Sequence, residues 1–194
     1  MSTVTINTAT ASDIEKIIDM VVLAFSADPF ERWLYPDPHA YLINFPTFIK
    51  AVTAQAFESR NVYYVDGYAG AALWLPPDIH LDEEPIITSL EQTISKQKMA
   101  DTSAIMEQMA FYHPHEPHWY LAVIGVDGAR QGLGFGSMLL QHTLASCDRE
   151  HALAYLESTN PKNISLYERH GFELLGTIQA GNAPPMFPML RKPR

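Results

Sequence analysis

The chain has 194 residues, a formal net charge of −9, and 47% hydrophobic, 11% aromatic and 18% charged residues. This length fits one domain, so we expect residues 1–194 to fold as a single unit. The apolar content excludes a disordered chain, and the negative charge opposes binding to nucleic acids or anionic membranes.

The beginning of the chain, residues 1–6, lacks the basic region and apolar core of a signal peptide. The longest apolar stretch, residues 120–126, is too short to span a bilayer. The lone Cys147 cannot form a disulfide within the chain and suits the apolar face of a helix. We therefore expect a cytoplasmic protein without a membrane segment.

The first half predicts strands and helices in alternation. Residues 4–8 alternate like a strand, and Ser12 with Glu15 predicts a capping box before a helix that reaches residue 25. Prolines and aromatic residues at 29–38 indicate an ordered loop or a short helical turn. A helix at 40–59, a hairpin of strands 62–65 and 68–75 around Asp66-Gly67, and helical composition at 85–112 follow.

The second half alternates more regularly. It predicts strand 118–126, a glycine-rich turn, a helix ending near 150, strand 152–157, helix 161–170, strand 172–178 and a closing strand at 186–190. The basic residues at 191–194 indicate a solvated tail.

The glycine-rich turn carries the most chemical content. Gly132, Gly134 and Gly136 lie between a strand and a helix, where bare backbone N–H groups and the helix dipole can bind a pyrophosphate. A flexible, tightly packed turn is the structural alternative. The turn has no Gly-Lys pair and is not a P-loop. Ser137 stands where a dinucleotide fingerprint has its third glycine, which leaves a nicotinamide enzyme as a weaker alternative.

A third pattern fits these residues. Gln131-x-x-Gly134-x-Gly136 after a strand resembles the signature of the GNAT superfamily, the acetyl-CoA dependent N-acetyltransferases. Residues 160–172, with Leu166-Tyr167 and Gly171-Phe172, resemble its second cofactor segment. Segments 116–126, 155–158 and 189–193 are similar to the branch that includes puromycin N-acetyltransferase, whereas the first part of the chain matches loosely. Leu133 and Gly128 stand where many relatives have Lys and Pro.

The resemblance implies a mixed α/β (α+β) GNAT fold. Its mostly antiparallel sheet of six to seven strands would be flanked by helices and splayed between the strands that end at Val126 and Glu157. Residues 118–178 would form the acetyl-CoA-binding core.

The implied activity is transfer of the acetyl group of acetyl-CoA to a primary amine of a small molecule, by direct attack in a ternary complex and without a metal. Phe30, Trp33, Trp74 and Tyr112 favour an aromatic or cationic acceptor. A protein or peptide amine acetyltransferase and a non-catalytic acetyl-CoA-binding module are the alternatives. The resemblance also leaves a homodimer open.

The resemblance and the bare backbone of the turn together assign the cofactor-binding residues. These are Ile124, Gly125, Val126, Gln131, Gly132, Leu133, Gly134, Phe135, Gly136, Ser137, Asn160, Asn163 and Tyr167. Asn160 or Asn163 could equally cap a helix, and Arg130 could meet the phosphates or remain a surface residue. The resemblance makes Tyr167 the general acid, although a tyrosine here could also simply pack under its helix.

Glu157 is the first candidate for the general base, because it ends an apolar strand beside the expected opening. A structural carboxylate bonded to nearby backbone is the alternative role for Glu157. His113, His115 and His118 have suitable intrinsic pKa values and are further candidates for the base. The prolines between these histidines do not match an ordinary zinc site, so we expect no metal.

Overall fold

The computed structural model describes residues 4–194. The strands are β1 (Ile6–Thr8), β2 (Val62–Val65), β3 (Gly70–Leu75), β4 (His118–Val126), β5 (Leu153–Ser158), β6 (Glu173–Leu174) and β7 (Phe187–Arg191). The α-helices are α1 (Ile14–Ala24), α2 (Pro29–Leu34), α3 (Pro38–Glu58), α4 (Glu83–Thr93), α5 (Lys96–Tyr112), α6 (Phe135–Arg149) and α7 (Ile164–Arg169). Within the described chain, every helix is too short or too polar to cross a lipid bilayer.

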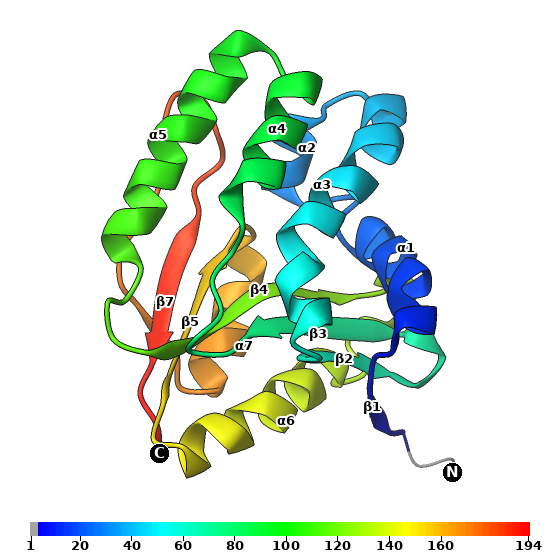
Figure 1. Cartoon of the computed structure of the whole chain (residues 1–194), viewed down its shortest axis with the longest axis vertical. Coiled ribbons are helices and arrows are strands. Elements are labelled where there is room, and N and C mark those ends of the chain that lie inside the picture. Colours follow the sequence, from blue (N-terminus) through cyan, green and yellow to red (C-terminus); the bar gives the residue numbers. More distant parts are fainter. Residues whose placement is uncertain (1–3) are drawn as a thin grey trace.

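The strands form one seven-stranded sheet in the order β1-β2-β3-β4-β5-β7-β6. Every neighbouring pair is antiparallel except β4 and β5, which run parallel. Helices flank this sheet on both faces (Figure 1). The predicted fold, a mixed and mostly antiparallel sheet between helices, is therefore confirmed.

β4 and β5 part after a short contact. Their pairing joins residues 118–120 to residues 153–155 and continues no further in the described chain. Beyond this point β4 stays paired with β3 on its other edge, and β5 stays paired with β7. The sheet is thus splayed between the strand ends at Val126 and Glu157, as predicted, and this opening positions the site.

Two apolar clusters cover the two faces of the sheet. One packs α1 to α5 against one face and contains Ile17, Phe45 and Leu73. The other packs α6 and α7 against the opposite face and contains Trp74 and Leu140. Leu73 and Trp74 are adjacent in β3 yet enter different clusters, because successive strand residues point to opposite faces.

The capping box before α1 lies earlier than predicted. It is formed by Thr10 and Asp13, whose Oδ2 accepts from the Thr10 backbone N–H at 2.8 Å. Ser12 lies inside the resulting 3-10 turn, so it does not cap the helix with Glu15. Hydrogen bonds from Thr10 and Tyr68 lower the pKa of Asp13 to about 2.

The predicted strand at 172–178 is shorter in the structure. It consists of Glu173–Leu174, and Ile178 forms only an isolated bridge to Met186. Gly176 lies between these pieces, where a Cβ atom would be 2.3 Å from the Tyr112 hydroxyl. Glycine weakens a strand and here permits the close approach of this ring.

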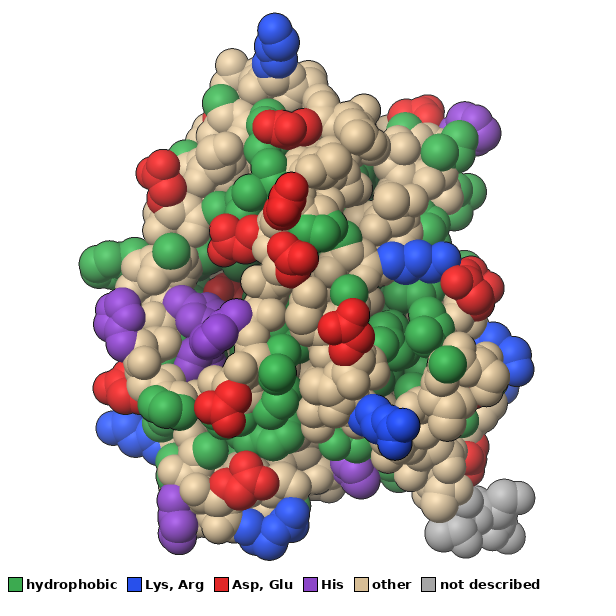
Figure 2. Space-filling model, in the orientation of Figure 1, with side chains coloured by type: hydrophobic (Ala, Val, Ile, Leu, Met, Phe, Trp, Pro, Cys, Tyr) green, Lys and Arg blue, Asp and Glu red, His purple; other side chains and the backbone are tan. Residues whose placement is uncertain are grey.

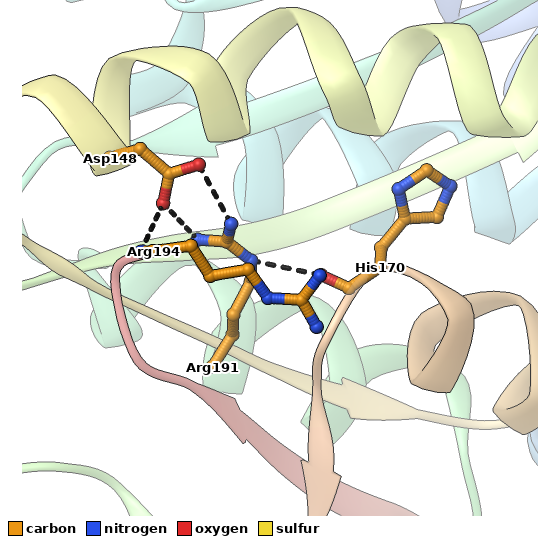
Figure 3. A network of polar contacts seen from close by, with 4 residues as sticks. All are labelled: Asp148, His170, Arg191 and Arg194. Atoms are coloured by element: carbon orange, nitrogen blue, oxygen red, sulfur yellow. Dashed lines mark hydrogen bonds and ion pairs between the residues drawn. The ribbon is translucent and has the colours of Figure 1, made fainter.

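The prediction of a solvated basic tail is wrong for Arg191 (Figure 3). Its side chain is only 4% exposed, and its guanidinium lies 2.8 Å from Oδ1 and 2.9 Å from Oδ2 of Asp148 in α6. The backbone N–H of Arg194 also donates to Asp148, at 2.8 Å. The end of the chain is therefore fixed to the end of α6, because a buried guanidinium needs a carboxylate partner.

Candidate active site

A cavity of about 1070 Å³ opens where β4 and β5 part. At one end its walls come from the glycine-rich turn, the start of α6 and α7. At the other end they come from α2, α3, α4 and α5, and β4 and β5 line the space between. One continuous cavity thus passes through the opening in the sheet.

The glycine-rich turn presents free backbone donors to this cavity. Gly132 and Gly134 have φ values of 77° and 84°, in the left-handed region that favours glycine. The first helical hydrogen bond of α6 runs from Met138 N to Gly134 O, at 3.0 Å, so the N–H groups of residues 135–137 have no acceptor within the helix. Together with the helix dipole, these groups fit a phosphate group.

Nearly all the residues that the sequence predicts for the site line this cavity. Leu133 is the exception, because its side chain is 60% exposed and does not line the cavity. The predicted residues that line it are Ile124, Gly125, Val126, Gln131, Gly132, Gly134, Phe135, Gly136, Ser137, Glu157, Asn160, Asn163 and Tyr167. Segments far apart in the sequence therefore face one space.

The start of α6 is held by the chain that follows α7. The Ser137 hydroxyl lies 2.8 Å from Nε2 of His170, whose carbonyl oxygen accepts from Nε of Arg191 at 2.9 Å (Figure 3). Burial, and then the nearby arginines, lower the pKa of His170. Neutral His170 therefore fixes the Ser137 side chain at the start of α6, where Ser137 lines the cavity.

Asn160 and Asn163 play different parts. Asn160 Oδ1 accepts from the backbone N–H of Lys162 at 3.1 Å and caps the short turn before α7. Asn163 makes no side-chain cap and lines the cavity. Arg130 is exposed at the cavity edge. The whole Asn163 amide is therefore available to a ligand, whereas Asn160 uses its Oδ1 in the cap and keeps its Nδ2 available.

Tyr167 lies on α7, is 4% exposed and lines the cavity. Burial raises the pKa of Tyr167, and the Asp28 carboxylate raises it further. Asp28 belongs to the connection between α1 and α2, and its Oδ2 accepts from the Thr159 hydroxyl at 2.8 Å. The raised pKa keeps the Tyr167 hydroxyl protonated at neutral pH, as a proton donor must be.

Glu157 faces a chain of histidines. Its side chain is 2% exposed, and its Oε1 lies 4.0 Å from Nδ1 of His113 and accepts no hydrogen bond from the described residues. The Nε2 atoms of His113 and His118 are 2.9 Å apart, and Nδ1 of His118 lies 2.8 Å from the Glu116 carbonyl oxygen. His115 also lines the cavity. Figure 2 shows histidine side chains gathered on the face where α5 ends and β4 begins.

Two tyrosines that the sequence did not predict lie beside these residues: Tyr120 lines the cavity, and Tyr155 packs on His113 behind it. Tyr120 and Tyr155 are register partners in β4 and β5, and their ring centroids are 6.0 Å apart. Burial and the Glu157 carboxylate raise the pKa of both hydroxyls. Tyr155 could have been found from its spacing, because residues two apart in a strand share a face.

The predicted aromatic acceptor wall is mostly wrong, since only Phe30 of the four residues lines the cavity. Trp74 is completely buried against α6, on the other face of the sheet. Trp33 donates its indole N–H to Asn182 at 2.9 Å, and Tyr112 packs on Gly176. Sequence alone did not reveal which way these rings turn.

In residues 4–194 no three His, Cys, Asp or Glu side chains are arranged to hold a metal ion. Cys147 is buried in the apolar cluster under α6, as expected for a helix core residue. Burial raises the pKa of the Cys147 thiol to about 12, so it is not a thiolate at neutral pH.

Comparison with known proteins adds independent findings. Residues 90–172 match the model of the acetyltransferase (GNAT) family. An uncharacterized N-acetyltransferase of Schizosaccharomyces pombe is 27% identical over an alignment 210 positions long, which covers 94% of this chain and 81% of the relative. A mycothiol acetyltransferase of Acidothermus cellulolyticus is 40% identical over 68 residues, 34% of this chain and 21% of that enzyme.

A solved structure extends the likeness to the whole chain. It is that of a histone acetyltransferase HPA2 and related acetyltransferase from Corynebacterium glutamicum, which is 27% identical in sequence. The match covers 100% of this chain and 98% of that one, with a TM-score of 0.74. The overall fold is therefore shared with a known acetyltransferase structure.

Proposed function

The chain belongs to the GNAT superfamily of acetyltransferases, and from this membership we propose that it moves the acetyl group of acetyl-CoA to a primary amine of a small molecule. The amine attacks the thioester directly while both substrates are bound. The cavity is the main support for this proposal, because the glycine-rich turn, the buried Tyr167 and the buried Glu157 all line it.

Backbone groups are proposed to hold the cofactor. The N–H groups of residues 132–137 would bind its pyrophosphate, so no cation is needed at Leu133. Beyond Tyr120, β4 pairs only with β3, and its free edge at residues 124–126 suits the extended, peptide-like pantetheine arm. Gln131 and Asn163 line the same path. Residues 118–178 are thus the proposed cofactor-binding core.

Acetyl-CoA supplies an activated acyl group to this site. The free edge of β4 also offers an N–H group to the acyl oxygen, where negative charge develops during attack. A fixed backbone donor of this kind stabilises the charge without having to reorganise.

A primary amine reaches the site as an ammonium ion and must lose a proton before it attacks. Glu157 is the proposed acceptor, directly or through water, because its Oε1 is buried and accepts no hydrogen bond from residues 4–194. His113, at 4.0 Å, can take the proton onward, and His118 orients His113. Three residues, one directly after α5, one in β4 and one in β5, thereby form one proton-accepting wall.

Tyr167 is the proposed general acid. Its protonated hydroxyl lines the cavity on the side of α7, opposite the helices that surround the acceptor end. It would donate its proton to the thiolate that departs as the C–S bond breaks.

Thiol release from acetyl-CoA tests the proposal. We expect release that depends on small primary amines and falls about a hundredfold or more in Glu157→Gln, the usual effect of losing a general base. Release with lysine peptides but not with small amines would instead identify a protein acetyltransferase. Cofactor binding without any amine-dependent release, and with no effect of Tyr167→Phe, would leave only a binding module.

A further inference from the structure

A second buried carboxylate lies in the acceptor end of the cavity. Glu31 of α2 lines the cavity, is 6% exposed, and its Oε2 accepts no hydrogen bond in the described chain. Asp28 fixes the start of α2, since its Oδ1 accepts from the backbone N–H groups of Phe30 at 2.9 Å and of Glu31 at 3.3 Å. Glu31 is thereby held in place without a partner of its own.

The nearby cations are engaged elsewhere. Arg32 donates to the carbonyl oxygen of Pro36 at 2.6 Å. Lys98 donates to the carbonyl oxygens of Trp33 and Leu34, the latter at 3.0 Å. Burial, and then the Asp28 carboxylate, raise the pKa of Glu31 to about 8. At neutral pH Glu31 is therefore mainly a neutral carboxyl in the free protein, and a cation that enters the cavity would displace its proton and pair with the carboxylate.

Neighbouring hydroxyls do not fill this role. The Tyr41 hydroxyl donates to the carbonyl oxygen of Val22 at 2.6 Å, and the Tyr35 hydroxyl lies 3.0 Å from that of Thr93. The rest of the acceptor end is mainly apolar, with side chains from α3, α4 and α5 such as Ile49, Ile86 and Ile105. Of the other carboxylates that line the cavity here, Asp28 accepts from Thr159 and from the start of α2, and Glu83 is exposed. An apolar space with one buried carboxyl group that lacks a partner fits an apolar segment that carries a cationic group.

Glu31 and Glu157 lie on different elements, α2 and β5, yet both line one cavity and each has an oxygen without a donor. We propose that the acceptor carries two cationic groups joined by an apolar spacer, its reacting amine at Glu157 and its second cation at Glu31. This inference rests on the proposed function. Glu31 is then a specificity-determining residue, and the substrate class is a diamine or an amine with a guanidinium group.

Matched acceptors test the proposal. We expect kcat/KM for hexamethylenediamine or tetramethylenediamine to exceed that for hexylamine or butylamine by about tenfold or more, the effect of one charge-assisted hydrogen bond. In Glu31→Gln this ratio should fall toward the value of about two that two equivalent amines give by statistics alone. Glu58→Gln, an exposed carboxylate at the end of α3, should keep the wild-type ratio.

The outcomes are separable from those of the proposed function. Turnover of monoamines and diamines at equal kcat/KM per amine would overturn the second cation site and leave the acetyltransferase proposal standing. If no amine is turned over, calorimetry with hexamethylenediamine still decides, because equal affinity of the wild type and Glu31→Gln would overturn the site. Should Glu31→Gln not fold, the comparison of diamine with monoamine in the wild type decides whether the second cation site exists.

Discussion

Nε2 of His113 lies 2.9 Å from Nε2 of His118. His118 presents Nδ1 to the Glu116 carbonyl oxygen, so Nδ1 carries the proton and Nε2 is the acceptor. His113 must therefore donate from Nε2, which leaves its Nδ1 toward Glu157 at 4.0 Å. The pair of Glu157 and His113 can thus take up one proton on the side that faces the cavity.

This arrangement predicts the effect of removing the acceptor for His113. His118→Phe should lower kcat about tenfold or more, since a misoriented base loses most of its benefit, while KM for acetyl-CoA stays the same. Steady-state kinetics with both substrates varied measures the split. The matched control is His142→Phe, because His142 stacks on Tyr63 on the α6 side, with ring centroids 4.5 Å apart. Equal losses in the two variants would contradict an orienting role for His118.

Tyr167→Phe removes the proposed acid without changing the shape of the ring. We expect kcat to fall about a hundredfold, the usual scale for a general acid, with little change in the affinity for coenzyme A. Thiol release and calorimetry measure the two effects separately. Tyr64→Phe serves as the control, because Tyr64 stacks on Tyr68 with ring centroids 4.8 Å apart and does not line the cavity. A Tyr167→Phe enzyme with the wild-type kcat would exclude Tyr167 as the acid.

Gly134→Val tests the pyrophosphate site. No protein atom lies within 4 Å of a Cβ at Gly134, so the new side chain would enter the space assigned to the cofactor. We expect coenzyme A to bind about tenfold more weakly or worse, because the side chain blocks the backbone donors.

A left-handed residue also loses about 1–2 kcal/mol of stability when it gains a side chain. Gly67→Val separates this strain from blocking, because Gly67 has a φ of 69°, equally open surroundings and no place in the cavity lining. Both variants should lose similar stability, and only Gly134→Val should lose affinity. Calorimetric affinity for coenzyme A that is the same in both would refute the placement of the pyrophosphate.

Glu31 predicts a dependence of stability on pH. Its pKa is raised from 4.5 to about 8 in the folded chain. Between these values the folded chain keeps a proton that the unfolded chain has released. This group's contribution to stability is therefore fully present below pH 4.5 and is lost as pH rises through about 8.

Replacing Glu31 by glutamine, its uncharged isostere, removes the loss of folding stability at high pH. Glu31→Gln should therefore gain stability over the wild type at about pH 9 compared with about pH 5, by a few kcal/mol at about 1.4 kcal/mol for each pKa unit. Urea denaturation at both values measures the difference, with Glu58→Gln as the control. A gain of the same size at both pH values would show that the carboxylate is not buried without a partner.

Local patterns in the sequence predicted most of the fold. Alternating residues predicted β4 over 118–126, and the glycines predicted the turn before α6, because both depend on neighbours along the chain. The Asn and Tyr positions of the second segment came from the resemblance, and the structure places Asn163 and Tyr167 at the cavity.

Local sequence patterns could not predict contacts between residues that are far apart in the chain. Arg191 was expected in solvent, but its partner Asp148 is 43 positions away, and Thr159 meets Asp28 across 131 positions. Glu31 lies in the first turn of α2, a segment that composition predicted only as a loop or a short helical turn. Its lack of a partner depends on the packing of α2 against the rest of the molecule, which no local pattern encodes.

A crystal structure with acetyl-CoA, or with coenzyme A, is the decisive experiment for the proposed site. We expect the pyrophosphate within hydrogen-bond distance of the N–H groups of residues 135–137, and the thioester sulfur between β4 and β5 within reach of the Tyr167 hydroxyl. A cofactor seated elsewhere on the molecule, or with its sulfur turned away from both Tyr167 and Glu157, would rule out the proposed acetyl transfer at this cavity.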